Sequence, residues 1–204
     1  MTSETGRSGY HHGDLRAALV TEALALIEER GVEGLSLREV ARRAGVSRAA
    51  PYHHFKNKEA MAAAVAESGF RELARCMDAI DDLGDPNAEL EACGRAYLAF
   101  ALKNPTLYRL MFGTKIEAMS DHPELQDAAR DSFGRLEGRL ARMGGSWSDA
   151  QAIAMAIWAS MHGMALLIID NLGPYDTAAP ANVERWTEAV MLLLGHGLEQ
   201  RGSP

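Results

Sequence analysis

The fold is decided by residues 36–58, SLREVARRAGVSRAAPYHHFKNK, which predict two short helices around a tight turn. Ser36 is placed to cap the first helix, and Glu39, three residues later, completes a capping box. Gly45 follows the last apolar position and predicts the left-handed residue of a sharp turn. Ser47 is then expected to cap the second helix. This order is typical of a helix-turn-helix, in which the second helix reads DNA.

The charge of this segment supports the same interpretation. It holds six arginines and lysines against one glutamate, a net +5 in a chain whose total is −7. Such a concentration of cations suits the phosphates of DNA. Small side chains at Ala49 and Ala50 would let the helix approach base edges, Arg48 can donate to a guanine edge, and Tyr52 and His54 can reach phosphates. A helical hairpin with a solvated basic face is the alternative.

Residues 31–58, followed by Glu59 and an alanine-rich helix, resemble the DNA-binding domain of the tetracycline-repressor (TetR) family. The resemblance implies that a first helix over residues 14–30 and a fourth helix from about residue 57 clamp the motif. Pro51 departs from a regular helix, because it lacks an N–H and is tolerated only if the turn is short. The DNA-binding positions predicted from the motif and the resemblance are Arg48, Ala49, Ala50, Tyr52, His53, His54, Lys58, Ser36 and Ser47.

The likeness extends to one subgroup of the family. Residues 9–16, GYHHGDLR, resemble its amino-terminal arm, and residues 97–112 resemble part of its carboxy-terminal domain. Trp158, His162 and Gly163 fit the Trp then His-Gly signature of that domain. The resemblance implies a larger helical domain for ligand binding and dimerisation.

The remaining sequence predicts helices and no strands. The expected fold is all-α with about nine helices: a three-helix, homeodomain-like helix-turn-helix domain and a larger carboxy-terminal domain. We place a disordered arm at 1–13, the DNA-binding domain at 14–75 and the ligand-binding and dimerisation domain at 76–204. Further helices are expected over 86–103, capped by Asp85; over 105–112; over 123–143; from a capping box at Ser148 to Gly173; and from a cap at Asn182.

An effector cavity and a dimer interface are predicted in the larger domain. Candidates to line the cavity are Phe100, Leu107, Met111, Phe112, Met119, Phe133, Met155, Trp158, Met161 and His162. Plain core packing is the alternative for each, and the sequence leaves open whether His162 contacts a ligand. The dimer candidates are Ala156, Ala159, Gly163, Leu167, Trp186, Val190, Leu194 and Leu198. A dimer would place two reading helices about 34 Å apart and predicts a palindromic operator.

Other function classes have little support in the sequence. The adjacent pairs His11-His12 and His53-His54 do not converge on one ion, so no metal site is predicted. Neither a cofactor nor a catalytic constellation is expected. We expect a cytoplasmic protein, because no apolar leader is visible and polar residues interrupt the apolar run 152–169. The predicted function is a homodimeric, ligand-responsive regulator of transcription, most simply a repressor that a small, largely apolar effector releases from double-stranded DNA. The alternative is a helical carrier or interaction module that no longer reads DNA.

Overall fold

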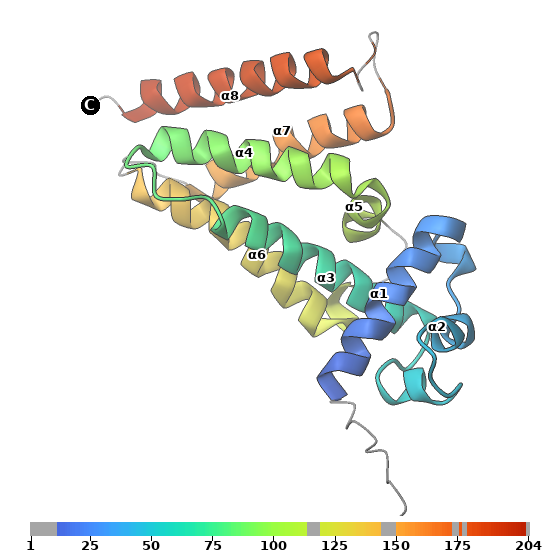
Figure 1. The fold of residues 1–204 in the computed structure, drawn as a ribbon. Helices are drawn as coiled ribbons and strands as arrows, with labels where there is room; N and C mark the ends of the chain where they lie inside the picture. The colour runs from blue at the N-terminus through green and yellow to red at the C-terminus, as the bar shows by residue number, and fades with distance from the viewer. Residues whose placement is uncertain (1–11, 114–118, 144–149, 173–175, 177–178, 203–204) are drawn as a thin grey trace, which may run out of the picture.

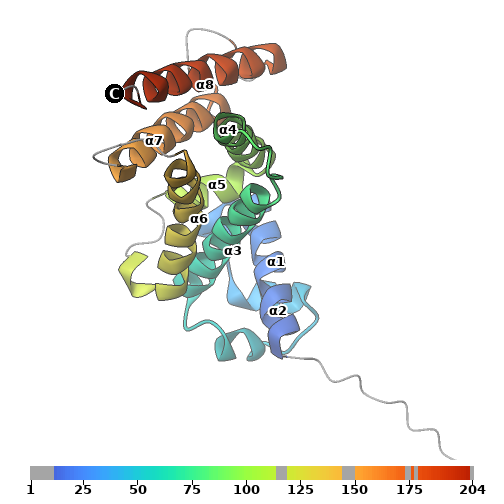
Figure 2. The same ribbon diagram turned by 90° about the vertical axis from the view of Figure 1, so that its left-hand side faces the viewer.

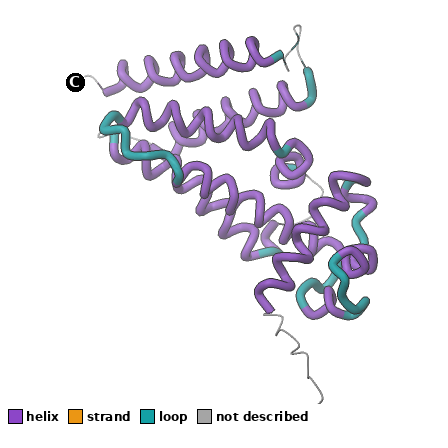
Figure 3. Tube along the Cα trace, viewed as in Figure 1, coloured by secondary structure: helices purple, strands orange, loops and turns teal. Residues whose placement is uncertain are grey.

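The computed structural model describes residues 12–113, 119–143, 150–172, 176 and 179–202. These residues form helices and no strand, which confirms the all-α fold class (Figure 3). The α-helices are α1 (His12–Arg30), α2 (Leu37–Arg43), α3 (Lys58–Asp78), α4 (Pro86–Lys103), α5 (Pro105–Phe112), α6 (Pro123–Arg142), α7 (Ala150–Ile169) and α8 (Pro180–Gly202). Short 3-10 helices are η1 (Val32–Gly34), η2 (Ala50–His53) and η3 (Met119–Asp121). The predicted arm at 1–13 lies almost wholly outside the described residues.

Helix α3 joins the two ends of the molecule. It leaves the small amino-terminal group of α1, α2 and η2 and runs into the larger group, where it lies beside α6 (Figure 1). The side chain of Asn57 caps its start by accepting a hydrogen bond from the N–H of Ala60 at 2.8 Å. A single apolar core includes α3 side chains from Met61 to Met77. The division at residue 75 stays a prediction, because α3 passes through it without a break.

Most of the predicted helix starts are confirmed. Asp85 accepts a hydrogen bond from the N–H of Asn87 at 2.9 Å, and Pro86 occupies the first position of α4. Pro105 and Pro123 likewise begin α5 and α6. A proline is favourable there, since the first N–H groups of a helix have no partner inside it.

The cap predicted for the last helix is wrong. Helix α8 begins two residues earlier, at Pro180, and the Nδ2 atom of Asn182 donates to the carbonyl of Asp176 at 2.8 Å. The expected capping box at Ser148 and the stop at Gly173 lie outside the described residues.

Helices α4, α7 and α8 pack at the end far from α1 and α2, with α8 outermost (Figures 1 and 2). Helix α7 is long and apolar enough to cross a membrane, with a mean hydropathy of 1.9, and 33% of its apolar window is buried inside the chain. By composition alone the core helix of a globular protein passes the same test. Much of α7 therefore remains accessible in the single chain.

Helices α3 and α5 approach each other closely at Gly69. A Cβ atom at this position would lie 2.5 Å from the Sδ atom of Met111 and 3.0 Å from Cδ1 of Leu107. Contacts below 3.0 Å are not sustained between real side chains, so a larger residue at position 69 would force the side chain of Met111 to shift. The close approach holds α5 against the middle of the helix that joins the two ends of the chain.

Candidate functional site

The turn after α2 has the predicted geometry. Gly45 has φ of 66°, and its N–H donates to the carbonyl of Arg42 at 3.3 Å. The N–H of Val46 reaches the carbonyl of Ala41 at 3.0 Å. This pair of bonds is a Schellman motif, in which the residue with positive φ is favourable only as glycine. The sharp turn of the helix-turn-helix is therefore confirmed.

The predicted second helix of the motif is wrong in form. Residues 50–53 make the 3-10 helix η2, with hydrogen bonds from the N–H of Ala50 to Ser47 and from Tyr52 to Ala49 at 3.0 and 3.1 Å. Pro51 has no N–H with which to reach the carbonyl of Ser47, so a regular α-helical turn cannot form there. Pro51 is buried, which fixes this short element to the domain.

Both predicted serine caps in the motif are wrong. Ser36 precedes α2 but makes no side-chain cap hydrogen bond. Glu39 turns instead to Arg42, whose guanidinium donates to its carboxylate at 2.8 and 2.9 Å, and to Arg43 at 3.4 Å. These hydrogen bonds, chiefly that from Arg42, lower the pKa of Glu39 to about 2. Ser47 caps no α-helix, since its carbonyl accepts the first bond of η2.

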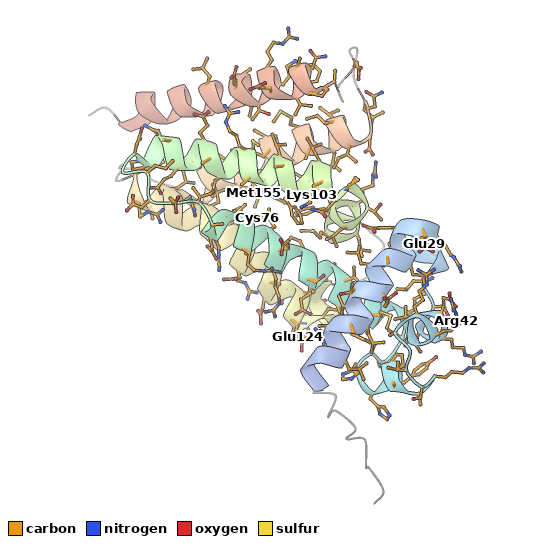
Figure 4. All side chains as sticks on the ribbon, in the orientation of Figure 1. Glu29, Arg42, Cys76, Lys103, Glu124 and Met155 are labelled. Carbon is orange, nitrogen blue, oxygen red and sulfur yellow. The ribbon has the colours of Figure 1, made fainter. Side chains whose placement is uncertain are left out.

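Three of the six cations of the motif, Arg42, Arg43 and Lys58, are engaged within the protein. Arg43 donates to Glu39 and also to both carboxylate oxygens of Glu29, the latter at 2.7 and 2.5 Å. Figure 4 shows Arg42 and Glu29 at the outer side of the amino-terminal group, away from the larger helices. Ion pairs at such an exposed site remain available for exchange with phosphates, because each is weak in water.

The predicted DNA-binding residues form a largely accessible surface. Exposed positions are Ser47, Arg48, Ala49, Tyr52 and His53, and half-buried ones are Ser36, Ala50, His54 and Lys58. The Nζ atom of Lys58 donates to the carbonyl of Glu33 at 2.7 Å, so in this structure the ammonium lies against η1. Beneath this surface Phe55 is buried, and the guanidinium of Arg16 lies 5.7 Å from its ring centroid. The same arginine pairs with Glu67 at 2.9 Å and ties α1 to α3.

A cavity of about 990 Å³ lies between α3, α4, α6, α7 and α8, with Phe112 at the end of α5 also in its lining. This size lies at the upper end of the range for small-molecule sites. Its apolar and aromatic lining comes from residues far apart in the sequence: Phe70, Leu73, Met77, Leu90, Phe112, Phe133, Leu136, Met155, Ile157, Trp158, Met161 and Leu192.

Five of the predicted cavity residues line this space: Phe112, Phe133, Met155, Trp158 and Met161. Phe100, Leu107 and Met111 do not, because they are buried in the core, the last two against α3 at Gly69. The side chain of Met119 lies outside those described. Sequence reasoning missed the contributions of α3 and α8, and on α4 it missed Leu90 and Tyr97. The helical spacing of Phe70, Leu73 and Met77 in the sequence was the available signal.

His162 does not line the cavity but stands directly behind its wall. Its ring stacks on Trp158 at a centroid distance of 5.5 Å and an interplanar angle of 26°. Its Nδ1 atom shares a hydrogen bond of 2.7 Å with the hydroxyl of Tyr108, which in turn lies 2.7 Å from the hydroxyl of Tyr97. A chain of three polar groups thus links α7, α5 and α4, and its far end, Tyr97, lines the cavity.

Burial shifts the pKa values of these three hydrogen-bonded side chains. It raises the pKa of Tyr97 to about 12 and raises that of Tyr108 further, so both phenols stay protonated. Burial lowers the pKa of His162 below its usual value of 6.5. The neutral imidazole can then either accept from Tyr108 or donate to it, depending on the tautomer.

The lowered pKa of His162 predicts a loss of stability in mild acid. Below about pH 6.5 the unfolded chain binds a proton at His162 more readily than the folded chain. Stability from this group is therefore complete above the unfolded pKa and declines as the pH falls through the folded pKa. Urea unfolding at about pH 7.5 and pH 5.5 should show a smaller pH effect in His162→Gln than in the natural chain. An equal pH effect in both proteins would contradict this assignment.

Comparison with known proteins decides the family. Residues 19–65 match the family model described as "Bacterial regulatory proteins, tetR family", and residues 90–194 match "Tetracyclin repressor-like, C-terminal domain". The chain belongs to the TetR family. Its members are transcriptional regulators rather than enzymes, with a DNA-binding and a ligand-binding domain.

Solved structures share the fold over nearly the whole chain. A protein of unknown function from Rhodococcus sp. RHA1 is 32% identical with a TM-score of 0.76, covering 94% of this TetR-family chain and 99% of that one. A transcriptional regulator from Rhodococcus sp. Rha1 is 25% identical with a TM-score of 0.70, covering 93% and 98%.

Curated relatives match over shorter segments. The class C tetracycline repressor protein of Escherichia coli is 47% identical over 53 residues, 26% of this chain and 24% of the repressor. The nucleoid occlusion factor SlmA of Vibrio vulnificus (strain YJ016) is 30% identical over 129 residues, 61% of this chain and 64% of SlmA. The chain thus spans less than two thirds of the length of these curated relatives. The likeness to the repressor is confined to a segment the size of a DNA-binding domain.

Proposed function

We propose that this chain is a repressor that binds a palindromic operator as a homodimer and is released by a small, largely apolar effector. The observation that carries the proposal is the double role of α3. Its first residue, Lys58, belongs to the predicted DNA-binding surface, and its later residues Phe70, Leu73 and Met77 line the cavity. An occupant of the cavity therefore contacts the same helix that begins at the reading surface. Such a regulator acts in the cytoplasm, where the operator is.

The outer face of α7 supports dimerisation. Ala152, Ala156, Ala159 and Leu167 are exposed, and Gly163 lies between them at helical spacing with nothing within 4 Å of its Cβ position. Half of the Leu167 surface is accessible. A continuous stripe of small apolar residues lets a second helix approach closely, and a soluble chain gains by covering it. Of the candidates on α8, Trp186 and Val190 are half-buried against the core, and the side chains of Leu194 and Leu198 lie outside those described.

Effector control requires two states of the dimer that differ in affinity for DNA. An effector that binds the cavity more tightly in the released state shifts the equilibrium by the difference in its two affinities. Couplings of this kind commonly amount to about 1–3 kcal/mol, which is roughly a 5- to 150-fold change in operator affinity. Helix α5 takes part, because it packs against both α3 and α1 and supplies Tyr108 to the polar chain.

Genomic fragments selected by the purified protein test the proposal and supply the operator. On that operator, Arg48→Ala should lose discrimination at one base position by about 1–3 kcal/mol. Lys58→Ala should instead weaken binding to all sequences and reduce the slope of log affinity against log salt by about 1. Binding isotherms at two salt concentrations, on operator and on scrambled DNA, separate the two effects.

The reverse pattern, with Lys58 controlling base preference, would refute the two residue roles. Recovery of no specific sequence, or binding insensitive to salt, would refute the proposed function itself. The protein would then be a helical carrier or an interaction module. Lys103→Ala serves as a control for both variants, because this exposed lysine at the end of α4 lies in the larger group of helices (Figure 4).

A further inference from the structure

The charged residues that line the cavity lie at its opening, and the buried residues of its floor are uncharged. Its charged residues are Asp85, Glu91, Arg95, Arg185 and Glu188, and all of them are exposed, so they form the rim. Arg95 and Glu91 pair with each other at 2.7 Å. Among the described residues that line the cavity and are buried, none carries a charge. A charged group on an occupant would therefore lose its water in the floor without gaining a counter-ion, which costs several kcal/mol in general.

Two hydroxyl groups are the polar features of this floor. Ser132 on α6 is 4% exposed and lines the cavity, and its hydroxyl makes no hydrogen bond with any described residue. Tyr97 on α4 is equally buried and ends the chain through Tyr108 to His162. Because this hydroxyl lines the cavity and has no partner within the described residues, Ser132 indicates a position where an occupant supplies one.

The hydrogen-bonded side chains of Tyr97, Tyr108 and His162 allow Tyr97 either to accept a hydrogen bond from a ligand hydroxyl or to donate one to a ligand carbonyl. When Tyr108 donates to Nδ1 of His162, Tyr97 donates to Tyr108, and its oxygen, which also accepts a hydrogen bond from Trp158, has one lone pair left for a ligand donor. With the other imidazole tautomer the direction reverses, and the Tyr97 proton is free for a ligand acceptor. A carbonyl oxygen uses the second arrangement, and a hydroxyl group can use both.

Resting on the ligand-responsive function proposed above, we propose that the effector is a neutral, largely apolar molecule whose carbonyl or hydroxyl oxygen binds Ser132 and Tyr97. Its apolar body fills the space between Phe70, Trp158 and Met161. Its oxygen meets the chain that leads through Tyr108 to α5, and α5 is held against α3 at Gly69. Carboxylate and ammonium analogues of the same skeleton are excluded from the floor by the cost of burying their charge.

Equilibrium dialysis of the full-length protein against four tricyclic probes tests this inference. The probes are fluorene, fluorenone, fluorenol and fluorenecarboxylate, which share one skeleton and differ in the oxygen group and its charge. Fluorenone and fluorenol should bind more tightly than fluorene by roughly two- to twelvefold, the gain expected from one net hydrogen bond. Fluorenecarboxylate should bind more weakly than fluorene.

Two variants locate the oxygen. In Ser132→Ala and in Tyr97→Phe the advantage of fluorenone over fluorene should fall, while binding of fluorene itself stays within about twofold, because the apolar lining is unchanged. Ser68→Ala is the matched control, since this α3 hydroxyl is bonded to the carbonyl of Val65 at 2.6 Å and does not line the cavity. It should keep the full advantage of fluorenone.

Tighter binding of the carboxylate than of the ketone would overturn the inference. An unchanged fluorenone advantage in both Ser132→Ala and Tyr97→Phe would do so as well, and so would failure of all the neutral probes to bind. Dialysis involves no DNA, so loss of the proposed regulatory function would appear separately, as failure to recover an operator. A protein that bound these probes as expected but recognised no DNA would keep this inference and lose the proposed function.

Discussion

Replacing Ala159 with glutamate should leave the chain monomeric at micromolar concentration and lower its affinity for a palindromic operator by about a hundredfold or more. Ala159 is exposed at the middle of the apolar stripe on α7. A second copy packed there would bury the introduced carboxylate, and in a twofold-symmetric contact it would bury two of them. Loss of the dimer removes the gain from binding two half-sites at once. Sedimentation equilibrium and binding isotherms on the same samples measure both effects.

A matched control distinguishes this result from general damage. Ala99 is an exposed alanine on α4, so Ala99→Glu introduces the same charge and should leave both oligomeric state and operator affinity unchanged. Circular dichroism should show equal helix content in the two variants. A dimeric Ala159→Glu with normal operator affinity would place the interface on another surface.

Replacing Tyr108 should cause the largest loss of stability. This side chain is fully buried where α4, α5 and α7 meet, and its ring lies against Phe112 and His162 at centroid distances of 4.8 and 5.6 Å. Tyr108→Ala should lower the free energy of unfolding by about 3–5 kcal/mol through the cavity that it leaves. Tyr108→Phe keeps the ring and should lower it by about 1–3 kcal/mol, because Tyr97 and His162 lose a shared partner.

Urea unfolding followed by circular dichroism measures both values. Tyr52→Ala is the comparison, since this tyrosine is 53% exposed and its loss should change stability by about 0.5 kcal/mol or less. If Tyr108→Phe were as stable as the natural chain, the hydrogen-bonded chain would contribute nothing to folding. The difference in free energy of unfolding between Tyr108→Phe and Tyr108→Ala measures the contribution of the aromatic ring.

Local chemistry made much of the fold predictable. Gly45, Asp85 and the prolines at 86, 105 and 123 act through their own backbone and nearest neighbours, so the turn and the helix starts followed from the sequence. The form of η2 also had a local cause in Pro51, but its effect was underestimated. The capping box at Ser36 failed because Glu39 had two arginines within reach on its own helix. Competition among several plausible partners is not decided by spacing alone.

The site depended on contacts that sequence spacing does not encode. Tyr108 and His162 are 54 residues apart, and their hydrogen bond exists only because α5 and α7 pack together. Leu107 and Met111 have the composition expected of a cavity lining, yet the close approach at Gly69 turns them toward α3. The unpartnered hydroxyl of Ser132 was invisible for the same reason. The sequence could identify which apolar residues are buried, but not which of them line the cavity and which pack in the core.

The uncovered stripe on α7 also has a genetic meaning. In a homodimer that pairs through this stripe, a variant subunit that still dimerises but binds DNA poorly forms mixed dimers with natural subunits. Those mixed dimers also bind the operator poorly. Defects in the reading surface around Arg48 are then dominant over the natural allele, whereas defects in the stripe itself are recessive, because such chains never enter a mixed pair. If the proposed homodimer forms, the pattern of inheritance thus depends on whether a substitution lies in the predicted reading surface or on α7.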